Sequence, residues 1–404
     1  MARSKTVRSP QPEPFRKTLT SVAANLHVGD WHLSHRHLKL PNTAPWSVRQ
    51  RALHGGKQEG VEVIDVDNGA LRFTVIPTRG MGVLRVEMGQ LHLGWNSPVR
   101  EVVHPQFVNL PSRGGLGWLE GFNEWLVRCG LESFGAPGPD QFRTHTGAEA
   151  KLDLTLHGKI ANIPAAEVEV IVERTPPHRI RVRGRVDERM LFGPNLELWT
   201  EISTEPGSTA FRIEDCVRNA GACAQEFQLL YHVNYGPPLL EAGARFRAAL
   251  QQVTPANDHS AKDLGKFDTY AAPTAGFAEQ VYFLEPLADD QGRTRILLQN
   301  AAADRGVSMS FALEQLPCLT LWKNTGALAD GYVTGLEPGT GFPNPRRVER
   351  EAGRVPTLAP GEARRFALDF DLHADTAQVA RAGAAIDQLN GQPRPQRVRI
   401  QVGQ

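Results

Sequence analysis

The sequence predicts an all-β fold, a large antiparallel sandwich or barrel with a few short helices. Segments that alternate apolar and polar residues recur along the chain, which is the pattern of half-buried strands. The 38 glycines and 29 prolines imply frequent turns, as many short strands require. The chain shows no regular succession of strands and helices, the pattern that would indicate a parallel sheet.

The elements are expected in the following order. Residues 1–58 are expected to form an N-terminal extension and lead-in, residues 59–374 one β-sandwich domain, and residues 375–404 a C-terminal helix and tail. Two strands are expected over 61–68 and 70–77, joined by a hairpin turn at Asn68-Gly69, and two shorter ones over 83–95. Residues 96–150 are rich in glycine, proline and aromatics, so a long structured loop with a helical turn or two near 117–127 is expected.

Six strands are then expected between residues 151 and 235, because alternating segments follow each other at short, turn-separated intervals. Residues 236–275 are expected to be loop. Further strands are expected over 280–286, 294–300, 306–314, 318–324 and 363–373. The stretch 330–362 is rich in glycine and proline and is expected to be a second long loop. An amphipathic helix is expected over 375–389.

Composition and charge argue against several classes of protein. Lys and Arg total 45 against 44 Asp and Glu, and this balance argues against a nucleic-acid-binding protein, which carries a basic face. The chain contains no apolar run long enough for a transmembrane helix. Its basic N-terminus lacks the apolar stretch of a signal peptide, so a cytoplasmic location is expected. Four cysteines are too few for a disulfide framework and are expected to be reduced. The expected partner is a small molecule, and the oligomeric state stays open.

Three segments carry residues suited to proton transfer. His157 ends a strand in TLHGKIANIP, His232 ends another in LLYHVNYGPPLL, and Glu337 lies in the glycine-rich GLEPGTGFPN. A histidine exchanges protons near neutral pH, and a carboxylate across a pocket performs the opposite half of the transfer. Taken singly, each of these residues is also compatible with a structural or solvated role.

Taken together and in order, these segments resemble the galactose mutarotase-like, or aldose 1-epimerase, family. His232-Val233-Asn234-Tyr235 is similar to its H-x-Y-F-N motif, Leu336-Glu337-Pro338 with Phe342-Pro343-Asn344 to its C-L-E-P-Q…F-P-D motif, and Leu156-His157-Gly158 to its L-H-G-G segment. The resemblance is closer to a bacterial aldose-1-epimerase-like branch of unknown function. That similarity is carried by Ile76 to Met81, Cys129-Gly130-Leu131, His157 to Ala165, Leu230 to Leu240, Trp322-Lys323 and Tyr332 to Pro338.

The resemblance implies a mutarotase-like sandwich and acid–base catalysis at or near the anomeric carbon of a sugar, without a cofactor. Glu337 would take the proton of the C1 hydroxyl, and His232 would protonate the ring oxygen as the ring opens. The substrate-binding residues implied are Arg79, His157, Asn234 and Lys323. Lys159, the shortened Asn234-Tyr235 element and Gly82 depart from the family pattern, so the sugar is not identified.

Two alternatives remain at this point. The same acid–base pair could drive a lyase or isomerase reaction of a keto- or acidic sugar, with a divalent metal held by His157, His232 and Glu337. The protein could also be a non-catalytic sugar-binding protein on the same fold.

Three further features of the sequence are open or weak. The histidines at 32, 35 and 37 indicate a packed or solvated segment rather than a metal site. The glycines at 114–117 lack the context of a phosphate-binding loop. Trp118, Phe122 and Trp125 are spaced either for one buried helix face or for a sugar-stacking platform.

Overall fold

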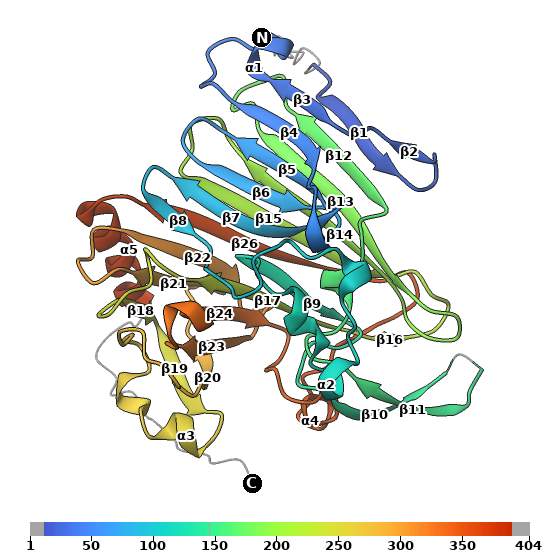
Figure 1. Cartoon of the computed structure of the whole chain (residues 1–404), viewed down its shortest axis with the longest axis vertical. Coiled ribbons are helices and arrows are strands. Elements are labelled where there is room, and N and C mark those ends of the chain that lie inside the picture. The colour runs from blue at the N-terminus through green and yellow to red at the C-terminus, as the bar shows by residue number, and fades with distance from the viewer. Residues whose placement is uncertain (1–11, 145, 390–404) are drawn as a thin grey trace, which may run out of the picture.

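The computed structural model describes residues 12–144 and 146–389, and two large antiparallel sheets dominate it (Figure 1). The strands of the first sheet are β1 (Phe15–Ser21), β2 (Leu26–His27), β12 (Glu167–Val172), β13 (Ile180–Arg189), β14 (Asn195–Thr204), β15 (Ala210–Asn219), β18 (Arg245–Ala248), β21 (Arg293–Gln299), β22 (Gly306–Ala312) and β26 (Ala363–His373). They are ordered β18-β21-β22-β26-β15-β14-β13-β12-β1-β2.

The second sheet has twelve strands and carries the candidate site. Its strands are β3 (Trp31–Ser34), β4 (Ser47–Ala52), β5 (Glu62–Asp67), β6 (Arg72–Ile76), β7 (Gly82–Met88), β8 (Leu91–Leu93), β9 (Leu126–Leu131), β17 (Gln228–Tyr235), β19 (Leu250–Pro255), β20 (Gln280–Pro286), β23 (Cys318–Asn324) and β24 (Val333–Gly339). They are ordered β19-β20-β23-β24-β17-β9-β7-β6-β5-β4-β3, and β8 pairs with β7.

Short elements decorate these sheets. Two small two-stranded sheets pair β10 (Gly138–Arg143) with β11 (Glu149–Leu154), and β16 (Gln225–Glu226) with β25 (Thr357–Leu358). The helices are α1 (His35–Leu38), α2 (Ser112–Gly115), α3 (Asp258–Ala261), α4 (Arg346–Glu351) and α5 (Thr376–Leu389), with 3₁₀ turns η1 (Gly56–Gln58), η2 (Pro105–Phe107), η3 (Gly117–Gly121), η4 (Ile160–Asn162), η5 (Leu264–Lys266) and η6 (Leu328–Asp330). No helix among the described residues is both long and apolar enough to cross a membrane.

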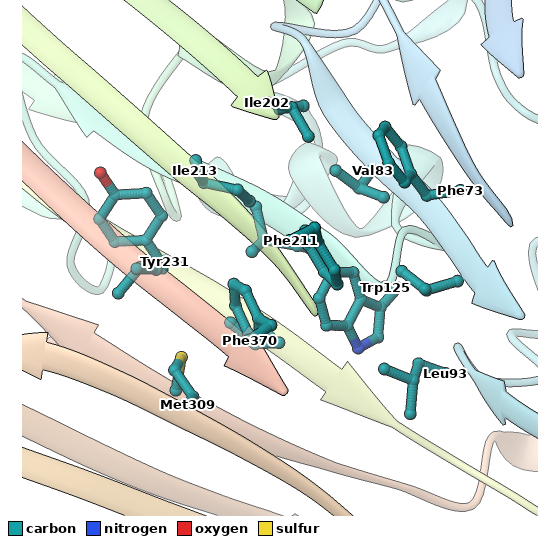
Figure 2. Packing of buried hydrophobic residues seen from close by; sticks show 14 of the residues in the cluster. Phe73, Val83, Leu93, Trp125, Ile202, Phe211, Ile213, Tyr231, Met309 and Phe370 are labelled. Carbon is teal, nitrogen blue, oxygen red and sulfur yellow. The ribbon is translucent and has the colours of Figure 1, made fainter. Parts of the chain in front are cut away.

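The main core fills the space between the two sheets. Alternation along β13 shows how the sequence produces it: every second residue is buried, whereas Arg181, Arg183 and Arg185 face outward. At the centre of the core, the rings of Phe211 and Phe370 stack with centroids 4.9 Å apart, and Trp125, just before β9 of the opposite sheet, meets Phe370 at 5.0 Å (Figure 2). Apolar burial on this scale is what stabilises a two-layer β fold.

The predicted fold class, the 61–77 hairpin, the last five of the six strands of 151–235 and the terminal helix are confirmed. The first of the six, β11, ends at Leu154 and pairs with β10 outside both large sheets, so His157 lies in a turn after it, and His232 lies within β17 and not at its end. The N-terminal part differs from the expected lead-in, because β1 pairs with β12 and β3–β4 extend the second sheet beyond β5. Residues 15–52 therefore complete both sheets, and residue 58 does not separate them from the rest of the sandwich. The expected loops also contain strands: β9 lies within 96–150, β18 and β19 lie within 236–275, and β24 lies within 330–362.

Candidate active site

His232 and Glu337 are cross-strand neighbours at the centre of the twelve-stranded sheet. β17 and β24 are adjacent and antiparallel, and their register, Val233 opposite Leu336, places His232 directly opposite Glu337. Directly opposite residues point to the same face of a sheet. His232 Nε2 lies 3.2 Å from Glu337 Oε1, and both side chains are more than nine-tenths buried. Glu337 Oε1 has no hydrogen-bond partner among the described residues, so its contact with His232 Nε2 is one of distance alone.

A glycine makes room for this pair. Gly335 lies on β24 two residues before Glu337 and therefore on the same face of the sheet. A Cβ atom at this position would lie 2.4 Å from Glu337 Oε1 and 3.1 Å from His232 Cε1. Only a residue without a side chain allows the carboxylate and the imidazole to meet here.

His157 reaches the same place from a turn in the chain. Its backbone has φ 58°, and the following Gly158 has φ 71°, a conformation that a turn requires and that glycine adopts readily. His157 Nδ1 lies 2.9 Å from the carbonyl oxygen of Phe134, and its ring centroid lies 5.2 Å from that of His232. Because the carbonyl can only accept, His157 Nδ1 carries the hydrogen and Nε2 is left as an acceptor.

Aromatic side chains surround the two histidines. Trp118 lies 4.5 Å from His157, and Phe122 and Trp322 lie 5.1 and 5.5 Å from His232, measured between ring centroids. Trp118 and Phe122 are buried, whereas Trp322 is half-buried at the rim. Half-buried indole rings beside polar groups suit the apolar face of a sugar ring.

Of the two interpretations of the Trp118, Phe122 and Trp125 spacing, the buried helix face is wrong. The chain leaves the η3 turn before Trp125 and enters β9, so these residues do not share one helix face. Trp118 and Phe122 pack on the histidines, while Trp125 packs in the inter-sheet core against Phe211.

Burial dominates the electrostatics of the site. It lowers the pKa of His232 well below its ordinary value, with a further lowering by nearby His157. It lowers the pKa of His157 to about 4, and it raises the pKa of Glu337 well above its ordinary value, with a smaller contribution from Glu279. Removal from water disfavours every charged form. Burial therefore favours the uncharged form of each residue, an imidazole beside a carboxyl group.

Asn234 lies beside His232 and bonds protein groups. Its side-chain oxygen lies 2.6 Å from His232 Nδ1, and its amide nitrogen donates to the carbonyl oxygens of Glu124 and His232. The residue is fully buried. The structure therefore gives Asn234 contacts with protein groups in place of the sugar contact expected for it.

Arg79 and Lys323, also expected to bind substrate, are engaged elsewhere. Arg79 is fully buried; its Nε donates to Glu124 Oε1 at 2.6 Å and its Nη1 to the carbonyl oxygen of Val103. Lys323 lies opposite Thr334 and so faces away from Glu337, which lies opposite Thr320. Its ammonium donates to the carbonyl oxygens of Lys266 and Thr269. The structure does not bring either cation to the His232–Glu337 pair.

The three residues considered for a metal do gather, but not as a metal centre. No group of three His, Cys, Asp or Glu side chains in residues 12–144 and 146–389 has the arrangement needed to hold an ion. His157, His232 and Glu337 are therefore close without forming the His₂Glu set considered from the sequence. In the N-terminal cluster, His32 and His37 only touch edge to face, and His37 Nδ1 bonds Ser34.

The sequence interpretation missed two residues at the rim and floor of the site. Glu279, just before β20, accepts a 2.7 Å hydrogen bond from Trp322 Nε1 and so orients that indole. No pattern in the sequence marks this exposed glutamate. Gly335 was part of the quoted Tyr332 to Pro338 motif, but its role depends on a strand register that the motif alone does not reveal.

A large open groove lies elsewhere on the protein, apart from the His232–Glu337 site. It has a volume of about 1050 Å³ and lies on the ten-stranded sheet beside α5. Its charged groups bond one another, as Arg212 and Arg293 bond Asp369 at 2.7 and 2.6 Å. None of its lining residues belongs to the His232–Glu337 site.

The fold, two large antiparallel sheets packed face to face, matches the galactose mutarotase-like sandwich. Residues 58–372 match the family described as "Domain of unknown function (DUF4432)", and the chain belongs to that family. No curated protein matches the chain.

Solved structures support the fold assignment. A structure from Klebsiella pneumoniae, described as a "putative aldose 1-epimerase", is 40% identical, covers 96% of this chain and 98% of its own, and has a TM-score of 0.89. A galactose mutarotase-like protein from Clostridium acetobutylicum is 14% identical, with 86% and 99% covered and a TM-score of 0.53. An Escherichia coli K12 protein, also described as a "putative aldose 1-epimerase", is 13% identical, with 78% and 100% covered and a TM-score of 0.53. The last two show the fold alone.

Proposed function

We propose that this protein is a carbohydrate-active enzyme of the aldose 1-epimerase type, which interconverts the anomers of a sugar by acid–base catalysis. The observation that supports the proposal most directly is the buried cross-strand pair of His232 and Glu337, 3.2 Å apart. A proton donor and a proton acceptor held together in an aromatic-walled site are the groups that this reaction needs.

The number of protons on His232 and Glu337 suits the reaction. At rest the pair holds one proton that Glu337 and His232 can share, besides the hydrogen on Nδ1. Transfer of that proton from the carboxyl group to Nε2 produces a carboxylate and an imidazolium without changing the total charge. The carboxylate then takes the proton of the C1 hydroxyl while the imidazolium protonates the ring oxygen. Ring opening, rotation about C1–C2 and closure give the other anomer.

The positions of His157 and Trp322 suggest how they would contact the sugar. His157 Nε2 is an acceptor for a sugar hydroxyl, and Trp322, oriented by Glu279, is a stacking surface at the rim. Both proton transfers use side chains, so the proposal requires no cofactor. The K. pneumoniae protein is described as a "putative aldose 1-epimerase", which is the same activity.

Proton NMR of the anomeric signals tests the proposal. The purified protein is added to a panel of neutral aldoses, uronic acids and 3-keto-glycosides, and the exchange rate between α and β signals is measured. We expect faster exchange for at least one sugar. We expect this acceleration to fall by at least about 100-fold in Glu337→Gln and in His232→Ala, which is the scale of a positioned acid or base.

Other outcomes assign other functions. New vinylic signals, or deuterium uptake at a ring carbon, would replace mutarotation by a lyase or isomerase reaction. Line broadening of a sugar without any turnover, unchanged in Glu337→Gln, would show a sugar-binding protein and contradict the catalytic roles of both residues.

A further inference from the structure

The side-chain amide of Asn234 bonds backbone carbonyl groups with its nitrogen and the His232 ring with its oxygen. Its amide nitrogen donates to the carbonyl oxygens of Glu124, at 3.0 Å, and of His232, at 3.1 Å. Both partners are acceptors only, so the nitrogen end of the amide must point to them. The oxygen end consequently faces His232 Nδ1 at 2.6 Å, and the amide cannot be flipped without losing these bonds.

This orientation determines which ring nitrogen of His232 carries a hydrogen. An amide oxygen only accepts, so Nδ1 must be the donor in the neutral ring. Nε2 is then the nitrogen with a free lone pair, and it is Nε2 that lies 3.2 Å from Glu337 Oε1. A ring with its hydrogen on Nε2 would present a bare Nδ1 to the amide oxygen, and two acceptors would face each other.

The side chain of Asn234 is itself held in place by contacts of the residues around it. Glu124, whose carbonyl oxygen receives Asn234, is fully buried; its carboxylate accepts from Arg79 Nε at 2.6 Å and from the backbone nitrogen of Asn123 at 3.1 Å. The backbone nitrogen of Asn234 donates to the carbonyl oxygen of Trp125 at 2.6 Å. The expected substrate ligands Arg79 and Asn234 thus form one chain of contacts that ends on His232.

We propose that Asn234 is a positioning residue that holds His232 in the Nδ1–H form and so directs Nε2 toward Glu337 and the reacting oxygen of the substrate. The proposal rests on the acid–base role proposed for His232. It assigns no sugar contact to Asn234, and it makes the buried Arg79–Glu124 pair the support of that residue.

Nitrogen-15 NMR of the resting protein tests the tautomer without any substrate. The protein is labelled at its histidine ring nitrogens, and the resonances absent from His232→Gln identify His232. We expect the Nδ1 of the wild-type His232 to carry a hydrogen. A spectrum in which only Nε2 carries the hydrogen would overturn the proposal, whether or not any sugar is turned over.

Two variants then separate positioning from general stability. In Asn234→Ala the His232 ring loses the acceptor at Nδ1, so we expect both tautomers in the spectrum. We also expect kcat to fall by at least about tenfold, which is a part of what a positioned acid or base contributes. Asn234→Asp keeps an acceptor at Nδ1, so we expect the Nδ1–H form to persist and kcat to exceed that of the alanine variant. An alanine variant with an unchanged ring spectrum and a kcat within about twofold of wild type would contradict the proposal.

A buried asparagine in the other sheet provides the matched control. Asn219 donates to the carbonyl oxygens of Cys223, Leu358 and Ala359. Asn219→Ala removes a comparable set of buried hydrogen bonds and is expected to lower the melting temperature without changing the His232 spectrum. If Asn219→Ala altered that spectrum as much as Asn234→Ala does, a general loosening of the fold would explain both results.

Discussion

At the scale of single residues, Gly335 offers the sharpest steric test of the site. Alanine there would place a methyl group 2.4 Å from Glu337 Oε1, so the carboxylate must move away from His232. A displacement of about 1 Å at a reacting group can cost on the order of 100-fold in rate. We therefore expect Gly335→Ala to lower kcat by about that factor, measured by anomeric exchange. Gly326→Ala, where the nearest atom is 3.4 Å away, is the control and should retain its rate.

The pH dependence of the rate follows from the directions of the two pKa shifts. A second proton on the pair inactivates it, and burial lowers the pKa of His232, so the acid limb of kcat/KM should lie below pH 6.5. Burial raises the pKa of Glu337, so the shared proton is retained well above pH 4.5. The neighbouring titratable groups are His157, Cys129 and Glu279, and both limbs belong to the coupled pair. An acid limb at or above pH 6.5 would contradict this assignment.

Whether the role of a residue could be predicted from the sequence depends on which groups it contacts in the fold. His157, His232 and Glu337 are predictable as a set, because each lies in a motif with a recognisable order, and the structure brings them together. Arg79 and Lys323 were expected to bind sugar because they carry charge within similar motifs. Their actual partners, Glu124 and the carbonyl oxygens of Lys266 and Thr269, lie far from them in sequence. Only the folded chain shows that both cations already bond protein groups, although Arg79 Nη2 has no hydrogen-bond partner among the described residues.

At the scale of elements, β24 is the clearest failure of sequence-based expectation. Its residues, VTGLEPG, contain glycines and a proline, which are typical of loops. The strand forms because β17 and β23 pair with it on both sides and every one of its residues is buried. By contrast, β13 and β14 were predictable, since their alternation is set by one face against the core and one face against water.

Lys323 on β23 holds a neighbouring segment, and its protonation should make the stability of the protein depend on pH. Its ammonium anchors residues 266 and 269, and burial lowers its pKa to about 8 from an ordinary 10.5. Between these pH values the unfolded chain binds more protons, so the stability of the wild type rises with pH. Relative to Lys323→Met, the wild type should gain on the order of 3 kcal/mol across this range.

Chemical denaturation at pH 7.5 and at pH 10 measures this difference. The same variant should leave KM for the sugar within about threefold, because the ammonium faces away from Glu337. A KM raised more than about tenfold in Lys323→Met would restore the binding role expected from the sequence.

At the scale of the whole molecule, a buried ion pair joins the two sheets behind the site. Arg128 on β9 donates to both carboxylate oxygens of Asp215 on β15, and both side chains are fully buried. Tyr231, next to His232, donates to the same carboxylate at 2.9 Å. Removal of one partner leaves an uncompensated buried charge, which costs about 3–5 kcal/mol.

We therefore expect Asp215→Asn to lower the free energy of unfolding by about that amount, measured by urea denaturation. Arg16→Ala removes an exposed ion pair with Glu169 and should cost no more than about 1 kcal/mol. Equal effects of the two changes would show that the buried pair does not hold the sheets together.

The placement of His232 and Glu337, the proposed acid and base, on adjacent central strands has a consequence for how related proteins diverge. Their separation is set by the spacing of neighbouring strands and by one register, neither of which depends on loop length. The segment that carries Trp118 and Phe122 comes from outside these two strands. Exchange of that covering segment between relatives should therefore change which sugar is accepted and leave the chemical step intact.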